Sequence, residues 1–318
     1  MFSKEYLINL SARTGFEPKN LQRQMILLEL LREINMHTLL GKKFALKGGT
    51  AINLFWLPLP RLSVDIDLNY IGGVDRETML KDRPIVERDL KRLIQSRDIT
   101  VEHAPTNHAG AKWRLRAKSA LGGHFTFEVD LNYIMRVPVG DIQTREVYPL
   151  DEDYVFTFDT VSIEELFAGK IKALLERLAA RDLYDVAALT ESQASYDRNK
   201  LRKTLILFGV TSDGDWRKKD FSTIDRIGQR QLDQELSALL REGETIDLAA
   251  MQQRAKDFLS ELMPYEDNER RFMDRFIDQG EYEPELLFDD PDQARRLKHH
   301  PAVLWKLQNH RKYLGVEK

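Results

Sequence analysis

Two segments of the sequence alternate strictly between apolar and polar side chains, and this pattern limits the possible folds more than any other feature. Apolar residues take every second position in SVDIDLNY, residues 63–70, and again in HFTFEVDLNYIM, residues 124–135. A two-residue period is typical of β-strands that bury one face. The polar face of the first strand carries Asp65 and Asp67, and that of the second carries Asp130. We therefore expect half-buried strands with carboxylates on their polar side.

Strand patterns are confined to the first half of the chain, and helical patterns fill most of the second half. The segment SIEE fits a capping box in which Ser162 opens a helix that runs to about residue 179. This separation favours an α+β fold in which a helical domain follows an α+β domain. We predict two domains, residues 1–198 and residues 199–318. Further helices are expected at 18–40, 50–56 and 76–96, and further strands at 44–47, 98–103 and 112–118.

Composition excludes several classes of protein and site. The 318 residues carry 48 Lys and Arg against 51 Asp and Glu, a formal net charge of −3, so the chain as a whole is not attracted to nucleic acid or anionic lipid. The absence of cysteine excludes disulfides and thiolate metal sites. No apolar run approaches the roughly 20 residues of a membrane-spanning helix, and no secretory signal pattern is present. We expect a cytoplasmic protein with no membrane contact.

The paired aspartates suggest a metal site. Carboxylates at positions i and i+2 of a strand project to the same side with Cα atoms about 6–7 Å apart, so Asp65 and Asp67 can share divalent cations. Mg²⁺ takes oxygen ligands and is commonly held by one or two carboxylates together with substrate phosphates. A third carboxylate would come from a neighbouring strand, where Asp130 is the better candidate and Glu128 the alternative. Taken alone, an Asp-x-Asp pattern is more often the solvated side of a sheet.

A Gly-Gly-Thr turn precedes these aspartates. Residues 48–50 follow an expected buried strand and start a helix, so their backbone N–H groups suit an anionic phosphate. By itself, such a turn usually has no functional role. Far fewer proteins have the turn followed, in this order, by a helix and two strands that carry aspartates, and that order indicates nucleotide phosphoryl chemistry. Arg61 and Ser63, just before the aspartates, are candidates for phosphate contacts, although Ser63 is equally well explained as a strand-end hydroxyl.

Four motifs in this order resemble a known family. The segments KGGTA, RLSVDIDL, FEVDLNY and AGKIKALLERLAARDLYD resemble the AbiEii/AbiGii toxin family of bacterial type IV toxin–antitoxin and phage abortive-infection systems. The resemblance runs from the N-terminal helix to about residue 190, with a weaker similarity in HPAVLWKLQNHRK. It implies a nucleotidyltransferase core related in fold to DNA polymerase beta, with a mixed sheet, flanking helices and a mainly helical C-terminal domain.

The resemblance also assigns roles to individual residues. Lys170 has independent support, because it falls on the apolar stripe of its helix while Lys172 falls on the outer face, and a lysine in that position needs an anionic partner. The alternative for Lys170 is that it snorkels to the domain edge, and Asp182 is equally well explained as a helix cap. The implied roles are phosphate binding for Gly48, Gly49, Thr50 and Lys170, metal binding for Asp65, Asp67 and Asp130, and a further active-site role for Asp182.

The activity that the resemblance implies is Mg²⁺-dependent nucleotidyl transfer, with Mn²⁺ as an alternative metal. The protein would transfer NMP from an NTP to an RNA acceptor, such as the 3′ end of a tRNA, and release pyrophosphate. It would act as a growth-arresting or antiviral toxin with a cognate antitoxin encoded nearby. Two alternatives stay open, namely a nucleotidyltransferase that modifies a protein or a small molecule, and a catalytically silent nucleotide-binding module.

Two basic segments are candidates for contact with the phosphate backbone of a polyanion. Arg114, Arg116 and Lys118 alternate on one strand, and residues 291–312 carry six Lys and Arg against one acid, Asp292. Basic patches of this kind bind nucleic acid in many proteins, although runs of charge are more often solvated faces.

Overall fold

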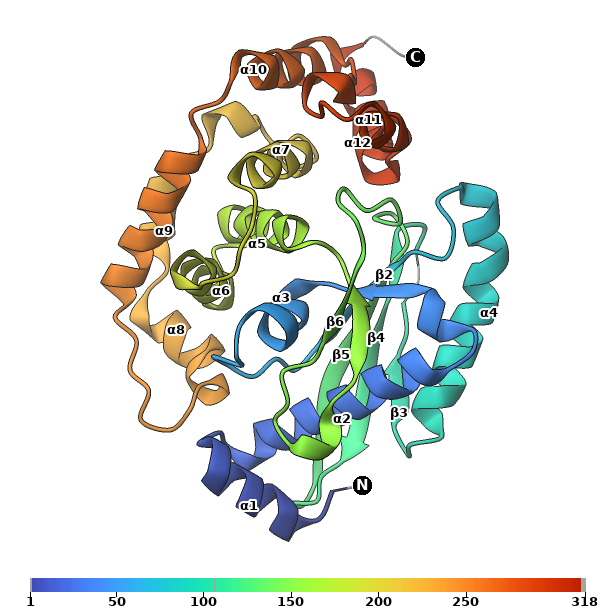
Figure 1. Cartoon of the computed structure of the whole chain (residues 1–318), viewed down its shortest axis with the longest axis vertical. Coiled ribbons are helices and arrows are strands. Elements are labelled where there is room, and N and C mark those ends of the chain that lie inside the picture. The colour runs from blue at the N-terminus through green and yellow to red at the C-terminus, as the bar shows by residue number, and fades with distance from the viewer. Residues whose placement is uncertain (1, 106, 316–318) are drawn as a thin grey trace. The chain divides into compact units, whose positions relative to one another are not determined.

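The computed structural model describes residues 2–105 and 107–315, coloured along the chain in Figure 1. Its contacts divide the chain into two compact units. The sheet unit comprises Met1–Arg136, Ile142–Val161 and Leu236–Thr245, and the helical unit comprises Val137–Asp141, Ser162–Glu235 and Ile246–Lys318. The domain boundary placed after residue 198 stays a prediction. Among the described residues, no helix combines the length and the apolar character that a membrane crossing requires.

A seven-stranded mixed sheet forms the centre of the sheet unit (Figure 1). Its strands lie in the order β3-β4-β5-β2-β1-β7-β6. β2 pairs parallel with β5 and antiparallel with β1, so two strands that are far apart in the sequence lie side by side. The mixed sheet and the helices that follow it confirm the predicted α+β fold. The strands are β1 (Phe44–Leu46), β2 (Ile66–Tyr70), β3 (Thr100–His103), β4 (Gly110–Lys118), β5 (His124–Asn132), β6 (Gln143–Glu146) and β7 (Thr157–Thr160).

The helices of the sheet unit largely follow the apolar periods of the sequence. The predicted helix at 50–56 is present, but its second half is a π-helical turn that ends at Trp56, ahead of Pro58. The sequence analysis did not predict α1, β6 or β7, and the two strands are four-residue segments, QTRE and TFDT, too short and polar to show a clear period. The helices are α1 (Lys4–Thr14), α2 (Pro18–Met36), α3 (Gly48–Ala51) and α4 (Arg76–Gln95).

One face of the sheet is buried beneath α2 and α4. Along β5 the apolar residues are buried and the intervening polar residues are partly exposed, which confirms the predicted alternation. Arg23 of α2 lies over the ring of Phe125, and Arg83 of α4 lies over the ring of Tyr133, so both helices cover the apolar side of this strand. The opposite face carries the polar side chains and is the face on which chemistry can take place.

The helical unit consists of helices joined by short 3₁₀ and π turns. Ser162 caps the first of them as predicted, since its hydroxyl accepts from the Glu165 N–H at 3.3 Å. The carboxylate of Glu165 accepts from the backbone N–H of Val139 at 2.8 Å and thereby holds that segment on α5. The helices are α5 (Ile163–Arg177), α6 (Ala180–Glu191), α7 (Arg198–Gly209), α8 (Gln229–Glu235), α9 (Leu248–Leu262), α10 (Asp267–Asp274), α11 (Pro291–Leu297) and α12 (Pro301–Leu314).

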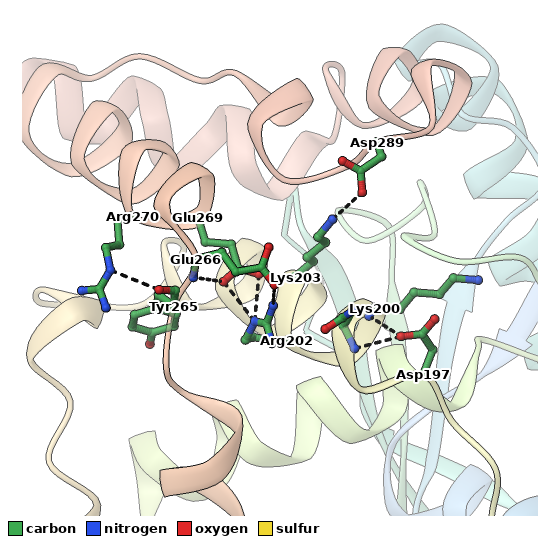
Figure 2. Close-up of polar contacts among 10 residues, drawn as sticks. Asp197, Lys200, Arg202, Lys203, Tyr265, Glu266, Glu269, Arg270 and Asp289 are labelled. Carbon is green, nitrogen blue, oxygen red and sulfur yellow. Dashed lines mark hydrogen bonds and ion pairs between the residues drawn. The ribbon is translucent and has the colours of Figure 1, made fainter.

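Ion pairs fasten α7 to the start of α10, as Figure 2 shows. The Arg202 guanidinium donates to both carboxylate oxygens of Glu269, at 2.9 and 3.0 Å, and also contacts Glu266. Glu269 is 1 % exposed, so its charge depends on this partner. Lys203 pairs with Asp289 at 2.6 Å, but that carboxylate is 90 % exposed and the pair is worth little.

Candidate active site

Two of the three predicted aspartates are directly opposed in the sheet, and the third lies just before the same pair of strands. Asp67 of β2 lies directly opposite Asp130 of β5 in the parallel pair, and residues opposed in this way project to the same face. The alternation had predicted that Asp65 lies within the strand. β2 begins at Ile66, so Asp65 instead lies just before it. Its Oδ1 nevertheless accepts from the backbone N–H of Glu128 at 3.2 Å, which places its carboxylate beside β5. Asp67 and Asp130 are therefore directly opposed, and the Asp65 carboxylate lies against the β5 backbone next to them in sequence.

The charge on Asp130 is costly in this position. Burial raises the pKa of the Asp130 carboxyl above its ordinary value, and the like charge of Asp67 raises it further. The nearby ammonium groups of Lys47 and Lys112 act in the opposite direction without cancelling the shift. Two acids that repel each other on a half-buried surface form a site that a cation would stabilise.

The Gly-Gly-Thr turn lies directly against Asp67. The backbone N–H of Lys47 donates to the Asp67 carbonyl oxygen at 2.9 Å, and α3 starts at the next residue. Gly48 has a φ of +71°, and a Cβ at this position would lie 2.2 Å from Asp67 Oδ2. Only glycine meets both conditions, because any side chain would be strained and would collide with the carboxylate. The predicted phosphate turn and the predicted metal ligands are therefore neighbours.

The hydroxyl groups near the turn face inward. Thr50 is 1 % exposed, and its Oγ1 donates to the Asp65 carbonyl oxygen at 2.5 Å and lies 2.7 Å from Ser63 Oγ. Arg61 is 2 % exposed and donates to the Leu62 carbonyl oxygen at 2.8 Å. These three side chains organise the loop that carries Asp65. Their direct contact with nucleotide phosphates stays a prediction.

Lys170 and Asp182 belong to a buried ionic cluster in the helical unit. The Lys170 Nζ lies 2.8 Å from Asp182 Oδ1 and 2.9 Å from Asp185 Oδ2, and both aspartate side chains are fully buried. The anionic partner that Lys170 requires is thus supplied by α6. Asp182 also accepts two hydrogen bonds from Arg177. The sequence analysis did not identify Asp185, although its spacing of three residues from Asp182 places both on one face of a helix.

The pKa of Asp182 reflects two opposed effects. Complete burial by itself would raise the pKa of this carboxyl, but the charges of Lys170 and Arg177 outweigh burial and hold it below its ordinary value. Asp182 is therefore an ionised carboxylate in the folded protein at neutral pH. The N-cap of α6 is Ala179 and has no side-chain cap hydrogen bond, so the alternative that Asp182 is the helix cap is wrong; its side chain binds cations instead.

A stripe of cations runs along β4 on the same face as the aspartates. Lys112, Arg114, Arg116 and Lys118 are exposed at alternate positions, and Lys112 lies opposite Asp130 in the sheet. The sequence analysis named the last three and missed Lys112. We call these four residues the β4 stripe. Because the stripe begins beside the carboxylates, a polyanion bound along it would lead directly to them.

The C-terminal basic segment is engaged in contacts within the helical unit. Arg296 and Arg311 donate to the carbonyl oxygens of Val139 and Gly280. The remaining pairs are Arg295 with Asp292, Lys298 with Glu285 and Lys306 with Asp213. These contacts explain much of the charge of this segment. The β4 stripe is partly paired as well, Lys112 with Glu128 and both Arg114 and Arg116 with Glu102, but it begins beside Asp130.

The aspartates offer the right atoms for a hard divalent cation but do not form a complete cage. Among the described residues, no group of three or more His, Cys, Asp or Glu is arranged to hold a metal ion by itself. Mg²⁺ is commonly bound by one or two carboxylates, with substrate phosphates and water completing its coordination. The opposed pair of Asp67 and Asp130 fits that mode of binding.

Comparison with known proteins places the chain in a family. The family model described as "Nucleotidyl transferase AbiEii toxin, Type IV TA system" matches residues 29–287, which is most of the sequence. The chain therefore belongs to the AbiEii family, and the resemblance seen in its motifs is confirmed. It is a nucleotidyltransferase toxin of a type IV toxin–antitoxin system, an enzyme that uses an NTP and has a cognate antitoxin.

A solved structure shows the same fold. MenT4, a nucleotidyltransferase toxin from Mycobacterium tuberculosis, superposes with a TM-score of 0.67 at 17 % sequence identity, covering 98 % of this chain and 99 % of that one. At this level of identity the similarity supports the fold over the whole length. No curated protein sequence matches the chain.

Proposed function

We propose that this AbiEii-family toxin transfers NMP to an RNA acceptor on the polar face of its sheet, with Asp65, Asp67 and Asp130 as the metal-binding residues. The observation that carries the proposal is the direct opposition of Asp67 and Asp130 beside the Gly48 turn. Carboxylates, a close backbone turn and a cationic stripe converge there, and together they suit a metal-bound triphosphate and an anionic acceptor.

The proposed reaction is an in-line displacement at the α-phosphorus of the NTP. An acceptor hydroxyl oxygen forms a bond to the α-phosphorus of the NTP, the bond to the bridging oxygen breaks, and pyrophosphate leaves. Asp130 lies where it could accept the hydroxyl proton, and we assign it that role beside its metal-binding role. A bound Mg²⁺ or Mn²⁺ would neutralise charge that develops on the phosphate oxygens. The turn at residues 48–50 binds the phosphate tail through its backbone N–H groups.

Asp130 is a better third carboxylate than Glu128. The Glu128 carboxylate is 43 % exposed and pairs with Lys112 at 2.8 Å, so its charge is already offset. Asp130 is half-buried, lies opposite Asp67 and has a raised pKa, and each of these features is typical of a functional acid.

Lys170 takes part in phosphate binding only if its Nζ exchanges one of its two aspartate partners for a phosphate oxygen. Such an exchange would leave a buried carboxylate with fewer cations, so it would be coupled to a rearrangement of α5 and α6. The proposed active-site role of Asp182 is to hold the Lys170 ammonium group in place. Nucleotide should then change the hydrogen exchange of α6 in the parent protein, and unchanged exchange would restrict both residues to a structural role.

The decisive experiment identifies the labelled product. Purified protein is incubated with each α-labelled NTP, total RNA and Mg²⁺ or Mn²⁺, and labelled RNA is resolved from labelled protein. We expect label in RNA, at the 3′ end of tRNA, and none with Asp67→Asn. Labelled polypeptide, or release of pyrophosphate without labelled RNA, would instead identify a protein or small-molecule acceptor. The same variant should lose growth arrest and antiviral activity in cells, and the cognate antitoxin should relieve the arrest caused by the parent.

The β4 stripe provides a separate test of the acceptor. Reversing two charges with Arg114→Glu and Arg116→Glu should raise the KM for RNA and reduce its dependence on salt, while the KM for NTP stays unchanged. The matched control reverses Arg88 and Arg92, two exposed cations of α4, which covers the other face of the sheet. Equal effects of both double variants would show that only net charge matters.

A further inference from the structure

Two glutamines of α2, Gln22 and Gln24, are completely buried in the sheet unit. Burying an amide is unfavourable unless its polar atoms find partners. Each side chain accepts one hydrogen bond through Oε1, while neither Nε2 has a hydrogen-bond partner among the described residues. An apolar side chain would avoid the cost of the unpaired Nε2 atoms, so the accepted hydrogen bonds are the physical reason to place amides here.

The two accepted hydrogen bonds lead to different places. Gln22 Oε1 accepts from the hydroxyl of Ser119, which lies immediately after β4. Gln24 Oε1 accepts from the backbone N–H of Ser63 at 2.9 Å, two residues before Asp65. Only the second of these bonds reaches the loop that carries a proposed metal ligand.

A continuous series of contacts connects Gln24 to Asp65. Gln24 holds the Ser63 backbone, the Ser63 hydroxyl lies 2.7 Å from the Thr50 hydroxyl, and Thr50 donates to the Asp65 carbonyl oxygen at 2.5 Å. All of these side chains except that of Asp65 are buried. The series therefore joins the helix on the apolar face, the turn at residues 48–50 and the loop before β2.

Asp65 needs this support because it lies outside the strand. Residues of β2 are fixed by regular pairing to β1 and β5. The pairing with β5 begins at Ile66. The loop before it is held by side-chain contacts, among them the Thr50 bond and the bond from the Glu128 N–H to the Asp65 carboxylate. Misplacement of a catalytic group by about 1 Å can reduce a rate by roughly 100-fold.

We propose that Gln24 is a positioning residue that fixes the Ser63 backbone and, through it, the carboxylate of Asp65. The inference rests on the proposed function, because it matters for catalysis only if Asp65 binds the metal. Gln24 lies on the buried side of the sheet and acts through the loop. This role depends on the hydrogen bond that Gln24 Oε1 accepts from the Ser63 N–H. The side chain at position 24 therefore needs an acceptor oxygen, and filling the same volume is not enough.

The experiment compares Gln24→Met with Gln22→Met. The two substitutions have the same shape change, the same helix and the same complete burial, so both should shift the melting temperature similarly. We expect Gln24→Met to speed hydrogen exchange at the Ser63 amide, to raise the Mg²⁺ concentration that half-saturates the thermal shift by about tenfold, and to lower kcat by roughly 10- to 100-fold. Gln22→Met should change none of these three. Gln24→Glu keeps an acceptor oxygen in either protonation state and should restore most of the Mg²⁺ response.

Several results would overturn the inference. If Gln24→Met and Gln22→Met responded equally to Mg²⁺, Gln24 would have only a packing role in the core and no positioning role. In the parent protein the Ser63 amide must be protected, and exchange as fast as in a free loop would disprove the contact even if no Gln24 variant folded. The proposed function fails separately: if Asp67→Asn keeps full transfer, the metal site is wrong whatever Gln24 does. If Asp67→Asn is inactive and Gln24→Met responds normally to Mg²⁺, only the positioning role is lost.

Discussion

Replacing Asp130 by asparagine should make the protein more stable and inactive at the same time. Asp130 and Asp67 are opposed on adjacent strands, about 4.8 Å apart in backbone spacing. Two unit charges about 5 Å apart at an effective dielectric constant near 20 repel by about 3 kcal/mol. Lys47 and Lys112 offset part of this repulsion. Asp130→Asn should therefore stabilise the metal-free protein by about 1–2 kcal/mol, a gain typical of removing an unfavourable charge at a functional site.

The sign of the pH dependence follows from the raised pKa of Asp130. Because its folded pKa lies above its unfolded value, the folded state binds more protons between the two, and ionisation at higher pH destabilises the fold. Above the folded pKa the gain from Asp130→Asn is complete. Below the unfolded pKa, about 3.9, both states are protonated and the gain disappears.

Thermal unfolding in EDTA, followed by circular dichroism from pH 4 to pH 8, measures this effect. A change of 1 kcal/mol moves the melting temperature by about 2–4 °C in a domain of roughly 150–250 residues such as the sheet unit, so we expect a rise of roughly 2–8 °C at pH 7 in the unfolding of that unit. Addition of Mg²⁺ and NTP should stabilise the parent more than the variant. Transfer to RNA should be lost.

The control is Asp159→Asn, a carboxylate of β7 in the same sheet that accepts a hydrogen bond from Thr144. It should show neither the stabilisation nor the loss of transfer. If Asp130→Asn kept full transfer, or if it destabilised the protein at pH 7 as much as a core substitution does, the opposed-carboxylate site would be refuted.

The remaining predictions concern buried charges of the helical unit. Lys170→Met removes a cation from the buried carboxylate of Asp182 and should cost about 3–5 kcal/mol in urea unfolding, whereas unchanged stability would contradict the cluster. Since the pKa of Asp182 is lowered, its contribution to stability is present above the ordinary pKa of about 3.9 and is lost as pH falls through the depressed value, so acid unfolding should begin at higher pH in Lys170→Met. Arg202→Met leaves the buried Glu269 carboxylate without the Nε–H that its two oxygens share and should cost about 3 kcal/mol or more. Lys203→Met, whose partner carboxylate is 90 % exposed, should cost less than about 1 kcal/mol, and equal losses from both substitutions would rule out burial as the cause.

The sequence by itself determined the elements whose periods are long and regular. The alternation in β5 and the apolar stripes of α4 and α5 reflect burial of one face, and burial repeats with the geometry of the backbone; α2 is buried on most of its sides instead. The motifs around Gly48 and Asp67 were readable for the same reason, since a turn that requires glycine and a strand with acids on one face are local patterns. β6 and β7 were missed because four polar residues carry no such signal.

Only the tertiary structure decided which groups became partners. The sequence showed that Lys170 needs an anion, but two carboxylates of α6 supply it, and one of them, Asp185, was not anticipated. Likewise, only the register of the sheet showed that Asp130, and not Glu128, lies opposite Asp67. Gln24 looked like an ordinary position in a helix until its oxygen was found on the Ser63 amide. Register, burial and hydrogen-bond partners arise between segments that are distant along the chain, so no local period contains them.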